Sequence, residues 1–86
     1  MRAQDILPDH VNTGEFNGVT VRKGTVGAFL ANARTLQAAD STEQARAEAR
    51  ADIVDAVPAM AALGMFDVFE ISDPALRALV AQHRPA

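Results

Sequence analysis

Two adjacent cations, Arg22 and Lys23, precede Gly24 and Thr25 where a β-type run gives way to a helical pattern. The free backbone amides of a helix start favour an anion. One hypothesis is therefore that a small anion or a phosphorylated metabolite binds at Arg22, Lys23 and Thr25. The residue order differs from a Walker A loop, in which the lysine follows a glycine. The interpretation that we favour is a structural turn, in which Gly24 gives backbone freedom, Thr25 caps the helix and solvent covers the cations.

Two further cations, Arg46 and Arg50, lie in an alanine-rich helical pattern. At 100° per residue they project beside Ile53 and Val57, at the edge of an apolar seam. One hypothesis is that Arg46 and Arg50 pair with carboxylates of a partner chain. In the interpretation that we favour, the core face is the neighbouring row, and both arginines lay their stems along its flank. That row consists of Ala45, Ala49, Ile53, Ala56, Met60 and Leu63.

Residue types that carry catalysis or bind metals are scarce in this chain. It has no Cys, Tyr or Trp, one Lys and two His. The lack of cysteine excludes disulfides, thiolate nucleophiles and sulfur-ligated metal sites. We interpret Glu48, Asp52 and Asp55 as a solvated acidic stripe, and His10 and His83 as structural residues. We therefore expect no catalytic residue, no metal site, no cofactor and no enzymatic activity.

The size and charge of the chain narrow the classes of partner. Its 86 residues suffice for one small domain, and its net charge of −3 lacks the basic excess typical of nucleic-acid binding. The longest apolar run, residues 56–66, is interrupted by Pro58 and is too short to cross a bilayer. Residues 1–5 do not resemble the start of a signal peptide. We therefore expect a cytoplasmic protein that binds neither nucleic acid nor membrane.

A β-hairpin is predicted to deliver the first pair of cations. Asn17 and Gly18 separate two short β-type runs, and this pair favours a type I′ turn because both residues tolerate positive φ. Residues 1–12 contain Pro8 and lack periodicity, so we expect an N-terminal arm with one turn near residues 4–7. Residues 13–86 are expected to form a single small domain.

A helix is predicted directly after the hairpin, and a second one soon follows. The first is expected to be capped by Thr25 and to run over residues 26–39, with its apolar face at 3.6-residue spacing. The second is expected to begin at Ser41, which fits a capping box with Gln44. In such a box the side chain of each of the two residues accepts a hydrogen bond from the backbone amide of the other.

The second helix is predicted to end at Gly64, a residue type favoured just past a helix end. Pro58 lies inside this span, where it removes a backbone hydrogen bond and clashes with the preceding turn. The apolar positions nevertheless keep helical phase across Pro58. We therefore expect either one kinked helix or two helices that meet near Asp55.

The C-terminal part of the chain predicts a short segment and a last helix. Residues 65–71 are β-like in composition but alternate poorly, so a third short strand near residues 66–71 and a turn are both open. Asp73 followed by Pro74 is a strong helix start. The last helix is expected over residues 74–83. Its buried side chains are expected to be Leu76, Leu79 and Val80.

Two apolar segments form the longest motifs of the chain. The first is Lys23-Gly24-Thr25-Val26-Gly27-Ala28-Phe29-Leu30, and the second is Leu63-Gly64-Met65-Phe66-Asp67-Val68-Phe69, with Val57-Pro58 between them. Together they resemble a group of small, uncharacterised bacterial proteins with no assigned function. The resemblance covers about residues 21–69. It implies a bacterial origin and a small domain, and it brings no activity, ligand or catalytic residue.

The patterns together predict a small α+β domain that is mainly helical, with an N-terminal β-hairpin packed on three to four helices. We expect a non-enzymatic protein–protein interaction module that binds a second copy of itself, as a homodimer, or another protein. The predicted contact surfaces are the apolar seam of the second helix and the edge of the hairpin. The alternative, from another functional class, is anion binding at the junction between the hairpin and the first helix.

Overall fold

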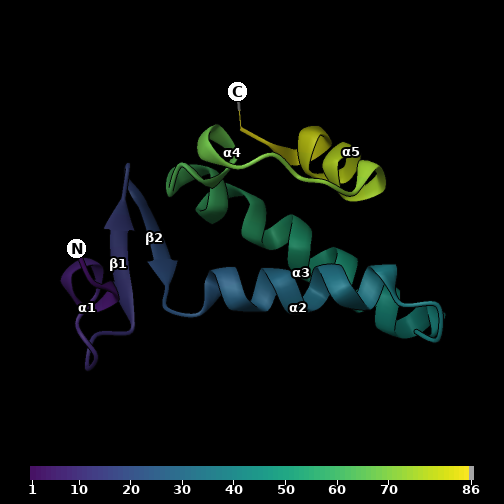
Figure 1. Cartoon of the computed structure of the whole chain (residues 1–86), viewed down its shortest axis with the longest axis horizontal. Helices are drawn as coiled ribbons and strands as arrows, with labels where there is room; N and C mark the ends of the chain where they lie inside the picture. The colour runs from purple at the N-terminus through teal and green to yellow at the C-terminus, as the bar shows by residue number, and fades with distance from the viewer. Residues whose placement is uncertain (86) are drawn as a thin grey trace.

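Within residues 1–85, which the computed structural model describes, the chain forms a short helix, a β-hairpin and four further helices (Figure 1). In chain order the elements are α1 (Ala3–Ile6), β1 (Thr13–Phe16), β2 (Val19–Arg22), α2 (Thr25–Gln37), α3 (Glu43–Ala62), α4 (Met65–Val68) and α5 (Pro74–His83). The fold is therefore α+β and mainly helical, as the sequence predicts.

The hairpin forms around the predicted Asn-Gly turn. β1 and β2 pair antiparallel, with Phe16 opposite Val19. Asn17 and Gly18 between them have φ angles of 48° and 80°, so both adopt the left-handed conformation of a type I′ turn. The Asn17 side-chain amide also donates to the backbone carbonyl of Ala62 (2.8 Å). The turn is thereby attached to the last residue of α3.

Helix α2 begins one residue earlier than the sequence predicts. Gly24 is its N-cap, with a φ angle of 92°, and Thr25 is its first helical residue. The Thr25 hydroxyl donates to the backbone carbonyl of Arg22 (2.6 Å), and it caps no amide of α2. The prediction of Thr25 as N-cap is therefore wrong. The chain leaves the hairpin through the left-handed turn at Gly24, which glycine adopts without a steric penalty.

The start of α3 also differs from the predicted capping box. Thr42 is the N-cap, and its hydroxyl oxygen accepts from the backbone amide of Ala45 (3.0 Å). The Ser41 hydroxyl instead donates to the carbonyl of Thr35 in the last turns of α2 (2.7 Å). The Gln44 side chain bonds along the helix. The predicted capping box is wrong because the Ser41 hydroxyl is bonded to α2. Thr42, the next residue, takes the N-cap position of α3.

Helix α3 is a single helix of 20 residues that contains Pro58. Pro58 is exposed, so its ring and its missing donor face solvent and not the core. The alternative of two helices meeting near Asp55 is therefore wrong. The predicted end is confirmed, because α3 stops at Ala62 and Gly64 follows with a φ angle of 84°.

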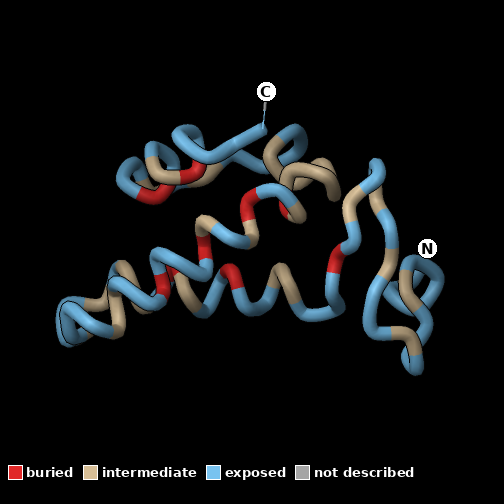
Figure 2. Tube along the Cα trace, turned by 180° about the vertical axis from the view of Figure 1, so that it is seen from behind, coloured by how far each residue is buried: buried red, intermediate tan, exposed pale blue. Residues whose placement is uncertain are grey.

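The core lies where α2 and α5 pack on α3, which also contacts α4 and β2 (Figure 2). The buried cluster consists of Phe29, Ala33, Ile53, Val57, Met60, Leu76 and Val80. Ile53 and Val57 have no exposed surface. The buried face of α3 is Ala49, Ile53, Val57 and Met60, so the favoured row is confirmed only in part: Val57 replaces Ala56 at its centre, and Ala45, Ala56 and Leu63 are half-buried. The expectation that part of this seam is exposed is wrong, because α2 and α5 cover it inside the monomer.

Residues 65–71 form a helical turn, α4, and then an extended segment, so the third short strand near residues 66–71 is wrong. The left-handed Gly64 turns the chain back over the end of α3, where Phe66 packs against Phe29 of α2. The apolar side chains that give residues 65–71 a β-like composition pack on helices, and this segment does not pair with the hairpin. Within the described residues four helices, α2 to α5, accompany the hairpin, in agreement with the three to four predicted, and α1 is a single turn in the N-terminal arm, where a turn was expected.

The start of the last helix is confirmed. Asp73 is the N-cap of α5, and its carboxylate accepts from the backbone amide of Leu76 (2.8 Å). Pro74 occupies the first helical position, where its missing donor costs nothing. Leu76 and Val80 are buried, and Leu79 is half-buried. The extended segment that joins α4 to this cap forms one side of the groove described next.

Candidate functional site

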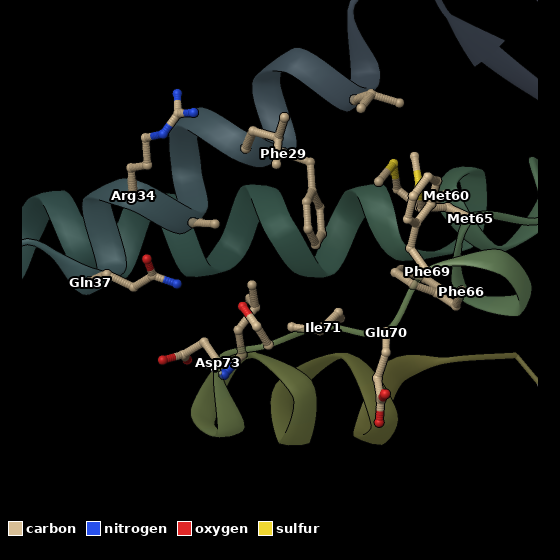
Figure 3. Close-up of a pocket in the computed structure, with 15 residues that line it drawn as sticks. Phe29, Arg34, Gln37, Met60, Met65, Phe66, Phe69, Glu70, Ile71 and Asp73 are labelled. Carbon is tan, nitrogen blue, oxygen red and sulfur yellow. Dashed lines mark hydrogen bonds between the residues drawn. The ribbon is translucent and has the colours of Figure 1, made fainter.

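A groove of about 480 Å³ opens between α2 and the segment that joins α4 to α5 (Figure 3). Helix α3 lies behind it. Its apolar lining includes Phe29, Met60, Met65, Phe66, Phe69 and Leu76. Polar side chains, Arg34, Gln37, Glu70 and Asp73 among them, stand at its edges. An apolar interior with a polar rim is the usual composition of a protein contact surface.

The groove exists because α2 and α5 make their main helix contacts with α3 and not with each other. Residues 69–73 run without regular secondary structure opposite α2. Side chains of α2 and α3 line the groove between this segment and α2. Phe29 points into this space and is buried. Leu30, the next residue, lines the open side of the groove and is 49% exposed.

Large apolar side chains remain accessible around the groove. Phe69 is 64% exposed and Leu30 is 49% exposed, and both line the groove. Met65 is half-buried and contributes a flexible, polarisable side chain to the lining, whereas Met60 belongs to the buried core. The exposed side chains of Leu30 and Phe69 lie on the same groove. Burying them against another molecule would stabilise the resulting complex.

The α4 side of the groove is fixed by contacts with α2 and with the end of α5. The rings of Phe29 and Phe66 lie 6.4 Å apart at an angle of 58°, a tilted aromatic pair. The Arg84 guanidinium stacks over the Phe66 ring at 5.4 Å and bonds the Asp67 carboxylate at 2.9 Å. Arg77 donates to the backbone carbonyl of Ile71 (2.9 Å). The wall is therefore preformed.

The predicted anion site is occupied in part by contacts within the chain. The Lys23 ammonium donates to the backbone carbonyls of Pro8 (2.8 Å) and Asp9 (3.1 Å), so it holds the N-terminal arm. The Thr25 hydroxyl donates to the carbonyl of Arg22. The Arg22 side chain is exposed. These contacts favour the structural interpretation, and the anion hypothesis stays a prediction.

The two arginines of α3 have different surroundings. Arg46 is half-buried, and its guanidinium donates to the backbone carbonyls of Ala38 (2.8 Å) and Ala39 (3.3 Å) just past the end of α2. A cation at this position satisfies carbonyls that the helix leaves free. Arg50 is exposed and lines a separate hollow of about 230 Å³ between α2, α3 and α5. The structure therefore gives Arg46 a structural role, whereas a partner role for Arg50 stays a prediction.

The remaining charged candidates do not gather into a site. Glu48, Asp52 and Asp55 are exposed on α3, and His10 and His83 are exposed near opposite ends of the chain. Within residues 1–85, no group of three His, Cys, Asp or Glu side chains could hold a metal ion. Among the same residues, no helix has both the length and the apolar character needed to span a bilayer.

The groove was not predicted from the sequence. Residues 65–71, which include Phe69, were predicted to form a strand or a turn, and no site was predicted at Leu30. One signal was available: large apolar side chains are dense in residues 60–71, with Met65, Phe66 and Phe69 close together. Sequence spacing shows this density, but it does not show which members stay accessible.

No family model, no curated protein and no solved structure matches this chain. A function must therefore be supported by the surfaces of the molecule itself. The groove combines two exposed large apolar side chains, Leu30 and Phe69, with a wall that contacts within the chain hold in place.

Proposed function

We propose that this chain is a non-enzymatic protein–protein interaction module that associates with a second copy of itself. The observation that carries the proposal is the apolar groove with Leu30 and Phe69 exposed on it. Water contact with such side chains is unfavourable, and full burial of one of them contributes about 1.5–3 kcal/mol. A partner that covers the groove gains this free energy, less the cost of association.

The small size of the chain supports a self-associating module. A domain of about 86 residues buries a limited share of its surface. Here the fully inaccessible side chains are Ile53 and Val57, at the centre of α3. A second copy adds a shared apolar layer without any further sequence, and two-fold dimers are the commonest symmetric oligomers of soluble chains.

Sedimentation equilibrium of the full chain, from low to high micromolar concentration, tests the proposal. We expect the apparent mass to rise with concentration from 9.1 kDa towards twice that value. A dissociation constant of about 1 μM corresponds to about 8 kcal/mol of association free energy. A constant monomer mass across the whole range would contradict the proposal.

A further inference from the structure

A side-chain hydrogen bond joins the turn of the hairpin to the end of α3 (Figure 1). The amide nitrogen of Asn17 donates to the backbone carbonyl of Ala62 over 2.8 Å. Only the NH₂ end of the amide can make this contact, because the reverse orientation would place two acceptor oxygens together. Within residues 1–85, no backbone amide donates to this carbonyl. Asn17 therefore satisfies an acceptor that the helix end leaves free.

The same turn holds the reacting groups of an asparagine deamidation. Asparagine is one of the chemically labile residues of proteins. In this reaction the backbone nitrogen of Gly18 attacks the side-chain carbonyl carbon of Asn17, the bond from that carbon to the NH₂ group breaks, and ammonia leaves with the proton of the backbone amide. Water then opens the cyclic succinimide to an aspartyl or an isoaspartyl residue. The reaction consumes water and releases ammonia, and it needs no oxidant and no enzyme.

The structure leaves the attacking nitrogen accessible. Gly18 is exposed, and a Cβ atom added to it would meet no other part of the chain within 4 Å. Within residues 1–85, its backbone amide donates no hydrogen bond, because the strand ladder pairs Phe16 with Val19 and leaves out the two turn residues. Neither a side chain nor a backbone partner therefore hinders the approach of this nitrogen to Asn17.

The other two asparagines of the chain lack these conditions. Asn12 is followed by Thr13, whose β-branched side chain crowds the backbone nitrogen. Asn32 is half-buried in the middle of α2, where the helical hydrogen bonds hold the backbone amide that follows it. Both serve as internal controls, because they age in the same molecule as Asn17.

Both products of the reaction remove the donor at the tip of the hairpin. The aspartyl product presents a carboxylate oxygen where the NH₂ group lay, so an anion faces the carbonyl oxygen of Ala62. This carbonyl lies at the C-terminal end of α3, where the helix dipole makes an added anion unfavourable. The isoaspartyl product also inserts a methylene group into the backbone, which lengthens a turn whose two residues fix the strand register.

We propose that Asn17 is a site of spontaneous deamidation, with water as the co-reactant, and that the modification releases the hairpin turn from the end of α3. The hairpin depends on its contacts with the helices, because a two-stranded sheet is marginal on its own in water. A further anchor is Val21, which is 5% exposed on the strand that contacts α3. The modification needs no partner chain, so its test is independent of the proposed self-association.

Prolonged incubation of the full chain in mildly alkaline buffer tests the site, because base removes the proton from the attacking nitrogen. Peptide mapping by mass spectrometry locates the product through the mass gained when NH becomes O. We expect Asn17 to be modified several times faster than Asn12 and Asn32. In concentrated urea, which unfolds the hairpin, the reaction at Asn17 should be faster than in buffer, because the bond to Ala62 then no longer holds the amide.

Asn17→Asp tests the consequence directly. An Asp-Gly pair also favours a type I′ turn, so the variant keeps the turn and changes the tether. We expect its melting temperature to fall by about 4–8 °C, the shift that loss of a hydrogen bond produces in a domain of this size. Hydrogen exchange should become faster in residues 13–22 and stay unchanged in α5. Asn12→Asp is the matched control, because this side chain is exposed and makes no hydrogen bond within the described residues.

Each part of the proposal has a result that would overturn it. Equal rates at the three asparagines, or no product at Asn17, would mean that the assigned site is wrong. An Asn17→Asp variant that melts and exchanges like the unmodified chain would show that the hairpin stays attached without this tether. An equal fall in melting temperature in Asn12→Asp would assign the effect to added negative charge in general, and it would also contradict the release of the turn from α3.

Discussion

At the scale of single residues, Phe69 is the side chain whose exposure most needs an explanation. It is 64% exposed and lines the groove, so its replacement by serine removes apolar surface from the proposed contact and little from the core. We expect Phe69→Ser to weaken dimerisation about tenfold or more, equivalent to about 1.4 kcal/mol. Sedimentation velocity measures this change.

Val68 offers a matched control for that experiment. It is 77% exposed, it precedes Phe69 in the chain, and it does not line the groove. Val68→Ser should leave the dimer unchanged and the melting temperature nearly so. An equal loss of association in both variants would show that general apolarity, and not the groove, drives the contact.

Residue chemistry alone could not locate the site, and the cations show why. Lys23 binds backbone carbonyls of the N-terminal arm, and Arg46 binds those of the loop just before its own helix, and side-chain spacing in the sequence does not reveal either contact. The sequence therefore suggests a ligand site at a cation even where the folded chain already supplies its hydrogen-bond acceptors. Arg34, for which no such contact is found within residues 1–85, is not among the candidate site residues that the sequence predicts.

At the scale of elements, the caps decide where each helix begins, and Thr42 is the cap of α3. Thr42→Ala removes the hydroxyl that accepts from the Ala45 amide, so we expect it to lower the free energy of unfolding by about 1 kcal/mol. Gln44→Ala serves as the control, because its side chain bonds only along the exposed surface of the helix. Thermal unfolding followed by circular dichroism measures both. A larger loss in Gln44→Ala would restore the predicted capping box.

Elements set by neighbouring residues could be predicted, and elements set by distant contacts could not. The Asn17-Gly18 turn, the Asp73-Pro74 start and the end at Gly64 all depend on backbone preferences within a few residues. Residues 65–71 have a β-like composition, yet the packing of Phe66 on Phe29 and the stacking of Arg84 on Phe66 make them part of the helical core. Those partners lie 37 and 18 residues away in the sequence.

At the scale of the whole molecule, the groove results from a division of contacts. α3 holds α2, α4 and α5 around its apolar row, so the outer helices do not close on each other. The α3 seam, which the sequence predicts as a partner surface, is therefore buried within the monomer. The apolar side chains that stay accessible lie on α2 and on residues 69–73. A pattern along one helix cannot show this, because the choice depends on how many helices share the seam.

The N-terminal arm is attached to the rest of the molecule chiefly through Lys23. Its ammonium bonds the carbonyls of Pro8 and Asp9, whereas helix α1 contributes no buried residue. Leu7 adds one apolar contact, over Gly14, where a Cβ atom would lie 2.7 Å from its Cδ1 atom. The arm therefore depends on the two side-chain hydrogen bonds of Lys23, on the backbone hydrogen bond from the Lys23 amide to the Asn12 carbonyl, and on the half-buried Leu7 and Val11, so we expect its local free energy of opening to be small.

Lys23→Ala is accordingly expected to release the arm and leave the core folded. Thermolysin should cut before the apolar residues of segment 1–12 severalfold faster than in the unmodified chain, while the free energy of unfolding falls by less than about 1 kcal/mol. Mass spectrometry of the early fragments measures the first effect and thermal unfolding the second. Arg22→Ala is the control, because the neighbouring guanidinium donates no side-chain hydrogen bond within the described residues. Equal cleavage rates in the two variants would mean that Leu7, and not Lys23, holds the arm.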